Sequence, residues 1–481
     1  MHLAAEYLPY ARTGGLGEAV RGMAHHQAAI GIPTTVVLPL YRAIREHRRE
    51  LELWGEPFAV PLGSESHLAR IYRGVPEPSG PDVVFIDHSS FFDRRGIYGE
   101  DGHDYEDNVL RFAFFSRAVL EALPQIYDGT VVLHPHDWHT ALAAVYLRTA
   151  FADDPRYREV VSVLSVHNAG YQGHFPPDSI AEVGLPQELY DSGDMEWYGR
   201  ANWLKGGLRF ADLVTTVSPG HAEELRHEPG GFGLYLEFKA LGDRLVGILN
   251  GIDTEDWNPA TDLEIAETYS RDDLTGKGSC KAWLQTELGL PTDTGIPLFG
   301  MAARMVEQKG IPLILESGIL ETSDAQFVFL GTGDPTLEES LQDIADRYPD
   351  RIAFTTEFTE RREHLLLAAA DLLLMPSLYE PCGLTQMRAL IYGALPVARR
   401  TGGLADTIND ERTGFLFDDY EPGELIEVVR RAIERFHQPD AWHAMVLEGM
   451  TRDFSWARSA RQYLDVYRRA LARRVEGPVG A

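Results

Sequence analysis

Short apolar runs rich in β-branched residues alternate with helical stretches along this chain, and that alternation limits the fold more than any other feature. In the first half the runs cover residues 34–40, 83–87, 131–135, 160–167 and 213–218. Helical stretches such as 16–30, 108–123 and 140–149 separate them. Strands that are apolar nearly throughout are buried on both faces, which is typical of a parallel sheet covered by helices. The first half therefore predicts an α/β unit.

The pattern restarts in the second half, with predicted strands at 297–303, 326–330, 351–354, 372–375 and 395–398. A chain of 481 residues is also too long for one hydrophobic core. We therefore predict two doubly wound, Rossmann-like domains with a cleft between them, over residues 1–246 and 247–455. The join falls near 246–258, where the segment 249–253 supplies a turn. The last segment, 456–481, is predicted to be helical from Trp456 to about Arg474.

The composition excludes several kinds of partner and environment. A net charge of −29 argues against nucleic acid and against an anionic membrane surface. No run approaches the roughly 20 apolar residues of a membrane helix, and the N-terminus lacks the regions of a secretory signal. The two cysteines, Cys280 and Cys382, lie far apart, which suits a reducing compartment. We expect a cytoplasmic protein that binds neither nucleic acid nor membrane.

Lysine is scarce, since only five of the 44 basic residues are lysines, at positions 205, 239, 277, 281 and 309. A bias that replaced dispensable lysines by arginine would leave lysine where a compact ammonium is needed. The retained lysines therefore mark positions where the shape of the cation matters as well as its charge.

A glycine pair follows the first short strand, in Arg12-Thr13-Gly14-Gly15-Leu16. In an open parallel sheet, ligands bind beyond the carboxyl ends of the strands. Paired glycines there let backbone amides approach an anion at a helix N-terminus. Gly14 and Gly15 are thus candidate ligand-binding residues, although such a pair is also common in plain tight turns.

Two histidine-bearing segments also follow predicted strands. The first, His134-Pro135-His136-Asp137-Trp138-His139, has a spacing that could provide metal ligands. Its order differs from common metallohydrolase patterns, however, and the sequence offers no second ligand cluster. The second segment, 165–173, places His167 beside a carboxamide, and such a pair offers neutral donors and acceptors for hydroxyl groups.

The second half supplies two cations and a carboxylate after its strands. Arg304 and Lys309 lie five residues apart on one predicted loop, and they can clamp two phosphates. Glu380 begins the segment 380–386, which is rich in small residues and is followed by a second such segment at 401–407. Cations for a diphosphate and a carboxylate for sugar hydroxyls are what a sugar-nucleotide site requires.

These segments, in this order over nearly the whole chain, closely resemble the bacterial glycogen synthase and plant starch synthase family. The resemblance implies the GT-B fold, in which two Rossmann-like domains face a central cleft and the last helix crosses back onto the first domain. It also implies a retaining glucosyltransferase that extends the non-reducing end of an α-1,4-glucan. The family needs no metal and no cofactor, and it carries a similar stretch at 134–139 without a catalytic metal.

Within this resemblance, one group of residues neutralises the diphosphate leaving group. Arg304 and Lys309 take this role, with Arg12 near them. The backbone amides of Leu384 and Thr385 meet the phosphates.

A second group holds the glucose as it becomes oxocarbenium-like. His167, Asp137, Asn250 and Glu380 contact its hydroxyls, and Phe358 offers its ring to the base. The resemblance makes His134 and His136 structural, and it identifies no residue of the acceptor site.

The sequence departs from the family pattern at several positions. Arg12 stands where the family normally has lysine, and Gly17-Glu18 replaces Ala-Asp. Arg388 occupies the place of a second glutamate that many related transferases carry and that this family does not require. ADP-glucose is the expected donor and a glucan primer the expected acceptor, with UDP-glucose as the alternative. A glucan phosphorylase would need pyridoxal phosphate on one of few lysines, and a non-catalytic glucan-binding homologue would not need the retained charged residues.

Overall fold

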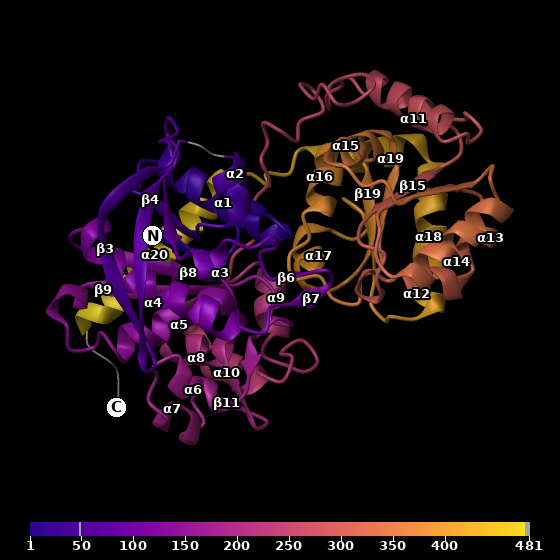
Figure 1. Cartoon of the computed structure of the whole chain (residues 1–481). Helices are drawn as coiled ribbons and strands as arrows, with labels where there is room; N and C mark the ends of the chain where they lie inside the picture. Colours follow the sequence, from indigo (N-terminus) through magenta and orange to yellow (C-terminus); the bar gives the residue numbers. More distant parts are fainter. Residues whose placement is uncertain (48–49, 477–481) are drawn as a thin grey trace. The chain divides into compact units, whose positions relative to one another are not determined.

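The structure is a computed structural model that describes residues 1–47 and 50–476. The chain divides into two compact units (Figure 1). Unit 1 comprises Met1–Gly251 together with Trp456–Ala481, and unit 2 comprises Ile252–Ser455. The dividing point follows Gly251, inside the turn segment expected at 246–258. Residues 477–481 of the expected C-terminal segment lie outside the described part.

Unit 1 is built on a nine-stranded sheet of order β14-β13-β9-β8-β1-β2-β5-β4-β3. Seven strands pair in parallel: β1 (His2–Leu3), β2 (Thr35–Pro39), β5 (Asp82–Asp87), β8 (Val131–Pro135), β9 (Val160–Val166), β13 (Leu213–Thr216) and β14 (Leu245–Gly247). All five strands expected in this half are present. They are buried almost throughout, as their apolar runs predicted.

An antiparallel hairpin extends this sheet beyond the parallel strands that the apolar runs predicted. Strand β3 (Glu52–Leu62) pairs with β4 (Glu65–Arg73), and β4 runs antiparallel to β5. Most residues of β3 are exposed, and prolines and a glycine interrupt it. Such a strand has no continuous apolar run that sequence reading could detect.

Helices cover both faces of the unit 1 sheet (Figure 1). Helix α1 (Gly15–Ala29) packs with α20 (Trp456–Glu476) on one face, where Val161 and Val163 of β9 join their cluster. The other face carries α4 (Asn108–Ile126), α5 (Trp138–Arg148) and α8 (Trp203–Phe210). A Cβ added at Gly22 would lie 1.9 Å from Nε1 of Trp456, so α1 and α20 meet at this glycine.

Unit 2 has a six-stranded sheet that is parallel throughout, of order β17-β16-β15-β18-β19-β20. The strands are β15 (Leu298–Ala302), β16 (Gln326–Leu330), β17 (Ile352–Thr355), β18 (Leu372–Met375), β19 (Leu395–Arg399) and β20 (Phe415–Phe417). The strand order runs outward in both directions from the β15–β18 pair. This reversal defines a switch point, where doubly wound sheets bind ligands.

The larger helices of unit 2 are α11 (Thr275–Glu287), α12 (Ile311–Ser317), α14 (Pro335–Arg347), α15 (Glu360–Ala369), α16 (Thr385–Ile391), α18 (Pro422–Phe436) and α19 (Pro439–Met450). Short elements of unit 1 are α2 (Arg42–His47), α3 (Ser89–Phe92), β6 (Gly99–Glu100), β7 (His103–Asp104), β10 (His174–Phe175), α6 (Ser179–Glu182), α7 (Glu188–Asp191), β11 (Glu196–Trp197), β12 (Arg200–Asn202), α9 (Pro219–Glu224) and α10 (Tyr235–Ala240). Unit 2 adds α13 (Ile319–Thr322) and α17 (Gly402–Thr407).

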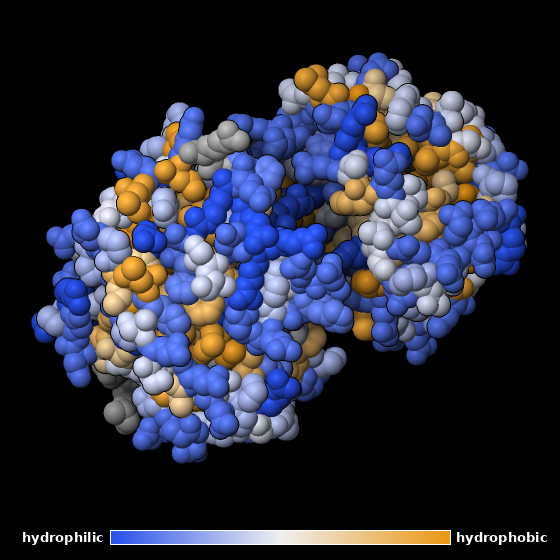
Figure 2. All heavy atoms as spheres, viewed as in Figure 1, coloured by the Kyte–Doolittle hydropathy of each residue, from blue (hydrophilic) through white to orange (hydrophobic). Residues whose placement is uncertain are grey.

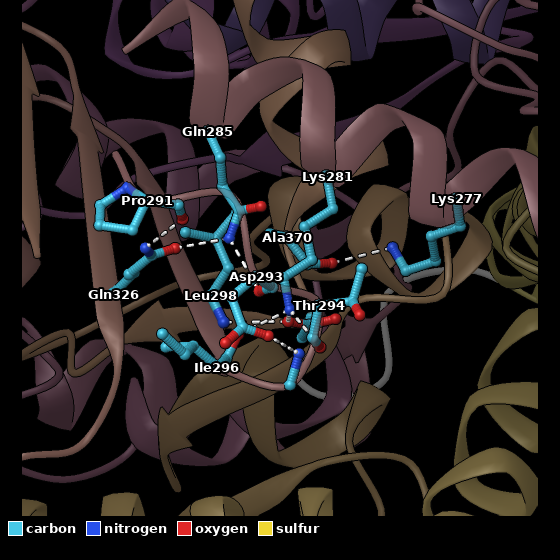
Figure 3. A network of polar contacts seen from close by, with 12 residues as sticks. Lys277, Lys281, Gln285, Pro291, Asp293, Thr294, Ile296, Leu298, Gln326 and Ala370 are labelled. Carbon is cyan, nitrogen blue, oxygen red and sulfur yellow. Dashed lines mark hydrogen bonds and ion pairs between the residues drawn. The ribbon is translucent and has the colours of Figure 1, made fainter. Parts of the chain in front are cut away.

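A buried ion pair fastens α11 to the sheet of unit 2 (Figure 3). The ammonium of Lys281 donates to Oδ2 of Asp371 at 2.6 Å and to the carbonyls of Ile296 and Thr294 at 2.6 and 3.1 Å. The same Oδ2 accepts the amide hydrogen of Leu298 at 2.9 Å, at the start of β15. All three donors of one ammonium are therefore used, which a planar guanidinium would not reproduce.

A second lysine of α11 serves the same purpose one turn earlier. Lys277 donates to the carbonyls of Ala370, Tyr392 and Ala368 at 2.8, 2.9 and 3.2 Å. Burial lowers the pKa of this lysine to about 8. Both contacts agree with the expectation that retained lysines mark places for a compact ammonium.

The outer surface on the face shown in Figure 2 is mostly hydrophilic, with apolar residues scattered among the hydrophilic ones. Across residues 1–47 and 50–476, no helix combines the length and the apolar character that crossing a bilayer requires.

Candidate active site

The switch point of unit 2 holds a cavity of about 160 Å³. Its walls come from the ends of β15 and β18, residues 301–303 and 373–375, and from Lys309, Ser377 and Thr385. The cavity thus lies beyond the carboxyl ends of the two strands at which the winding reverses. This is the place where an open α/β sheet binds ligands.

Lys309 and Glu380 meet at this cavity. Nζ of Lys309 lies 2.5 Å from Oε2 of Glu380, and their side chains are 19% and 9% exposed. Ser377 donates its hydroxyl to the same oxygen at 3.2 Å. Gly310 follows Lys309 with a φ of 81°, and a Cβ there would lie 2.1 Å from the carbonyl oxygen of Pro376. Close packing of the two post-strand loops therefore fixes the ion pair.

Arg304 begins the loop that carries Lys309, and its side chain is exposed. Nη2 of Arg304 lies 3.5 Å from Oε1 of Gln308. The loop is held by Met305, whose amide donates to Thr332 and whose carbonyl accepts from Asp334. Asp334 also caps α14 with its carboxylate. The glycine segment 331–334 is thus a turn that supports this loop.

The second small-residue segment supports Glu380. The amide of Gly403 donates to the carbonyl of Glu380 at 3.1 Å, and a Cβ at Gly403 would lie 2.1 Å from the carbonyl oxygen of Cys382. Thr385 lines the cavity and begins α16, with Leu384 as the N-cap residue. The backbone amides of the first turn of α16 therefore start beside the Lys309–Glu380 pair.

Phe358 and Arg388, two further positions of unit 2, do not line this cavity. Phe358 is 45% exposed in the loop between β17 and α15, away from the strands that form the cavity. Arg388 is buried on α16, with its guanidinium 4.0 Å from the ring centroid of Trp257 and Nη1 3.1 Å from Glu363. The arginine that stands where many related transferases have a second glutamate therefore contributes to packing within unit 2.

In unit 1 the glycine loop already holds a carboxylate of the chain itself. Glu6 is 3% exposed and accepts from the amides of Thr13 and Gly14 at 2.7 and 3.1 Å. It also accepts from the hydroxyls of Thr13 and Tyr98 at 2.7 and 2.6 Å. The amides of Thr13 and Gly14 therefore already have an acceptor within the chain, and the donor-binding roles of Gly14 and Gly15 stay predictions. Neither Glu6 nor Tyr98 was predicted from the sequence, because no motif marks them.

Gly14 and Gly15 are glycines that the folded chain itself does not require. A Cβ at either position would meet no atom within 4 Å, and neither residue has a positive φ. Arg12 precedes them and is exposed. Side chains here would project into open space in front of α1, with none of the described residues within 4 Å of the added Cβ.

Asp137 lies between β8 and α5 in a strained conformation. Its φ is 57°, in the left-handed region that non-glycine residues rarely adopt. The carboxylate accepts the amide hydrogen of His167 at 2.7 Å and is also bonded to the backbone of Asn168. Burial raises the pKa of Asp137 to about 7, although these backbone hydrogen bonds oppose the shift. The structure thus brings Asp137 and His167 together.

His167 also contacts a buried group of histidines. Its Nε2 lies 2.9 Å from Nδ1 of His136, and Nε2 of His136 lies 3.0 Å from Nδ1 of His2. Ring nitrogens of His2, His134 and His136 all lie within 4.8 Å of one another, a spacing that a metal ion could use. His2 was not predicted from the sequence, because its two-residue strand carries no recognisable pattern.

Asn250 is 7% exposed at the end of unit 1. Among the residues that the structure describes, none donates a hydrogen bond to its Oδ1. A buried polar atom normally has a partner, and leaving it without one costs about 1–3 kcal/mol. This acceptor is therefore suited to a hydroxyl supplied by a ligand.

Comparisons with known proteins identify the family of this chain. Residues 1–237 match the starch synthase catalytic domain, and residues 296–435 match the glycosyl transferases group 1. A glycogen synthase of Anaeromyxobacter sp. is 43% identical over 98% of this chain and 99% of that protein. The glycogen synthase of Koribacter versatilis is 39% identical over the full length of both. The chain belongs to the glycogen and starch synthase family.

Solved structures place this family member in the GT-B fold. The catalytic domain of starch synthase IV from Arabidopsis thaliana, bound to ADP and acarbose, superimposes with a TM-score of 0.87 and 34% identity, over 98% of this chain and 99% of that one. Sucrose-phosphate synthase from Thermosynechococcus elongatus, at 17% identity and a TM-score of 0.62, shares the fold. The predictions of the family, the fold class and a glycosyltransferase are confirmed. The roles of individual site residues stay predictions.

Proposed function

We propose that this enzyme transfers glucose from ADP-glucose to the non-reducing end of an α-1,4-glucan in the cytoplasm, with retention of configuration. The observation that carries the proposal is the Lys309–Glu380 pair in a cavity at the unit 2 switch point. The full-length similarity to bacterial glycogen synthases supports the reaction. The ADP bound to the plant starch synthase supports adenine as the base.

The cations of unit 2 would neutralise the departing diphosphate. The bond between C1 of glucose and the diphosphate oxygen breaks, and C1 bonds to the acceptor's hydroxyl oxygen, whose proton leaves with the diphosphate. Lys309 has three N–H donors, so it can keep Glu380 and also bind a phosphate oxygen. Arg304 and Arg12 would add charge, and the amides of Leu384 and Thr385 would bind phosphate oxygens.

The glucose would be held by hydroxyl contacts from Glu380, Asp137, His167 and Asn250. Asn250 supports this role most directly, because its buried Oδ1 lacks a donor among the described residues. Open space around the Cβ positions of Gly14 and Gly15 supports close approach of the donor to this loop. We further propose that Phe358 stacks on the nucleotide base.

Parallel assays with ADP-glucose and UDP-glucose on a maltodextrin primer test this function. The expected result is a larger kcat/KM with ADP-glucose and new α-1,4 linkages in the product. Preference for UDP-glucose would overturn the donor assignment. Release of glucose 1-phosphate from glucan with phosphate, together with the absorbance of a pyridoxal Schiff base, would instead identify a phosphorylase. Absence of turnover with either donor would leave a non-catalytic glucan-binding protein.

A further inference from the structure

A continuous hydrogen-bonded chain joins His167 to a glutamine on helix α1. Oε1 of Gln27 lies 2.9 Å from Nε2 of His2, and Nδ1 of His2 lies 3.0 Å from Nε2 of His136. Nδ1 of His136 then lies 2.9 Å from Nε2 of His167. The first three side chains are buried, whereas His167 is only partly buried. The chain therefore runs from the core of unit 1 to a residue that a ligand can reach.

The three histidines of this hydrogen-bonded chain, His2, His136 and His167, are all neutral near neutral pH. Burial lowers the pKa of His2 to about 3 and that of His167 to about 4, and it holds the pKa of His136 well below its usual range. A neutral imidazole has one N–H donor and one bare nitrogen that accepts. Fixing the role of one nitrogen therefore fixes the role of the other.

The amide orientation of Gln27 then determines each tautomer in turn. Its oxygen can only accept, so Nε2 of His2 carries the hydrogen and Nδ1 is bare. Nε2 of His136 must donate to that bare nitrogen, which leaves Nδ1 of His136 as an acceptor. Nε2 of His167 donates to it, and Nδ1 of His167 is left as a hydrogen-bond acceptor.

A second branch runs from the amide nitrogen of Gln27 through helix α20. Nε2 of Gln27 donates to the hydroxyl oxygen of Tyr467 at 3.0 Å. That hydroxyl lies 2.7 Å from Nδ1 of His134, and Nε2 of His134 lies 2.7 Å from Oγ of Ser165. Ser165 continues to Oγ1 of Thr215 at 2.6 Å. Turning the amide of Gln27 over would require every donor in both branches to reverse.

We propose that Gln27 and Tyr467 are positioning residues that set the tautomer of His167, so that its Nδ1 accepts a hydrogen bond from a hydroxyl of the sugar substrate. The role of the hydroxyl rests on the proposed function, whereas the tautomer itself does not. Hydrogen bonding also accounts for the ligand-like spacing of the three histidines His2, His134 and His136. Both ring nitrogens of His2, His134 and His136 already have hydrogen-bond partners at 2.7–3.0 Å.

The wild-type enzyme tests the tautomer directly by nitrogen NMR with ¹⁵N-labelled histidine. His167 is expected to show a protonated Nε2 and a bare Nδ1. Couplings across hydrogen bonds are expected between His2 and His136 and between His136 and His167. A protonated Nδ1 at His167, or the absence of both couplings, would overturn the proposal. So would stoichiometric zinc in the purified enzyme whose removal by chelator shifts the His2 and His136 resonances.

Two variants test the control exerted by the distant residues. Gln27→Met removes the acceptor for His2, and Tyr467→Phe removes the hydroxyl that orients Gln27. Both are expected to populate the Nδ1-protonated form of His167 and to reduce kcat/KM for the donor by roughly 3- to 10-fold, the scale of one hydrogen bond. An unchanged His167 tautomer in both folded variants would overturn the proposal.

Tyr157→Phe is the matched control, because Tyr157 is a buried tyrosine of unit 1 whose hydroxyl donates to the carbonyl of Leu120 at 2.7 Å. It should leave the tautomer and the kinetics unchanged. The NMR result requires no turnover. A wild-type enzyme that shows the expected tautomer but transfers no glucose would contradict the proposed function and leave this inference standing. If a variant fails to fold, the wild-type spectra still test the tautomer of His167.

Discussion

Removing the ammonium of Lys309 is the most direct perturbation of the unit 2 site. Nζ of Lys309 lies 2.5 Å from Glu380, whose side chain is only 9% exposed. In Lys309→Ala that carboxylate keeps the hydroxyl of Ser377 but loses its counter-charge. Leaving a largely buried carboxylate with one weak partner costs about 1–3 kcal/mol of unfolding free energy. The partial exposure of Lys309, at 19%, puts the cost below the 3–5 kcal/mol of a fully buried broken pair.

The effect on catalysis should exceed the effect on stability. A preorganised charge on a developing diphosphate contributes about 2–4 kcal/mol to the transition state. Lys309→Ala should therefore lower kcat/KM for the nucleotide sugar by roughly 30- to 900-fold. Steady-state kinetics with varied donor would measure this loss, and urea unfolding would show that the variant is folded at the assay temperature.

A double-mutant cycle with Glu380→Gln measures the interaction energy between Lys309 and Glu380. If the two side chains act together, the loss in the double variant should fall short of the summed single losses by more than about 1 kcal/mol. Lys239→Ala is the control, because Lys239 is exposed in unit 1. An unchanged kcat/KM in Lys309→Ala, or strictly additive losses, would refute the assigned role of the pair.

Three further predictions concern stability. The pKa of Asp137 is about 7 in the folded enzyme against an ordinary 3.8, so its stabilising contribution falls as pH rises from about 4 to 7. This difference in pKa corresponds to at most about 4 kcal/mol of unfolding free energy. Asp137→Asn should lack this fall when its unfolding free energy is measured at pH 4 and pH 8, and an equal fall in the variant and the wild type would contradict the prediction. Lys281→Met leaves the buried carboxylate of Asp371 without its cation. The unfolding free energy, measured with denaturant, should fall by about 3–5 kcal/mol. A fall below about 1 kcal/mol would show that the pair contributes little. Gly22→Ala should lower the melting temperature through a clash with Trp456 that costs about 1–3 kcal/mol, and an equal or higher melting temperature would show that the helices can separate without cost.

Strands buried on both faces could be predicted from the sequence, because burial imposes an unbroken apolar run. Strand β3 could not, since most of its residues face solvent and need no apolar side chain. Strand β20 was also missed, because three residues, Phe415–Phe417, are too short to distinguish from a loop.

The residues of the candidate site also divide into those that could be predicted from the sequence and those that could not. Lys309 and Glu380 could be placed because post-strand loops of one sheet edge converge, and the structure brings them together. The bond from Glu6 to the glycine loop depends on the exact path of the backbone, which composition does not encode. The chain from Gln27 to His167 joins residues that are remote in sequence, and only the folded sheet makes them neighbours.

The return of the chain end to unit 1 has a consequence for biosynthesis. Helix α20 covers Ala19, Met23, Val161 and Val163, and it emerges from the ribosome only after all of unit 2 has been made. The apolar face of the nascent first unit therefore stays uncovered while the roughly two hundred residues of unit 2 are translated. Premature termination before Trp456 would leave that face open permanently, so such fragments should be captured by chaperones or degraded, even though most of their first sheet is complete.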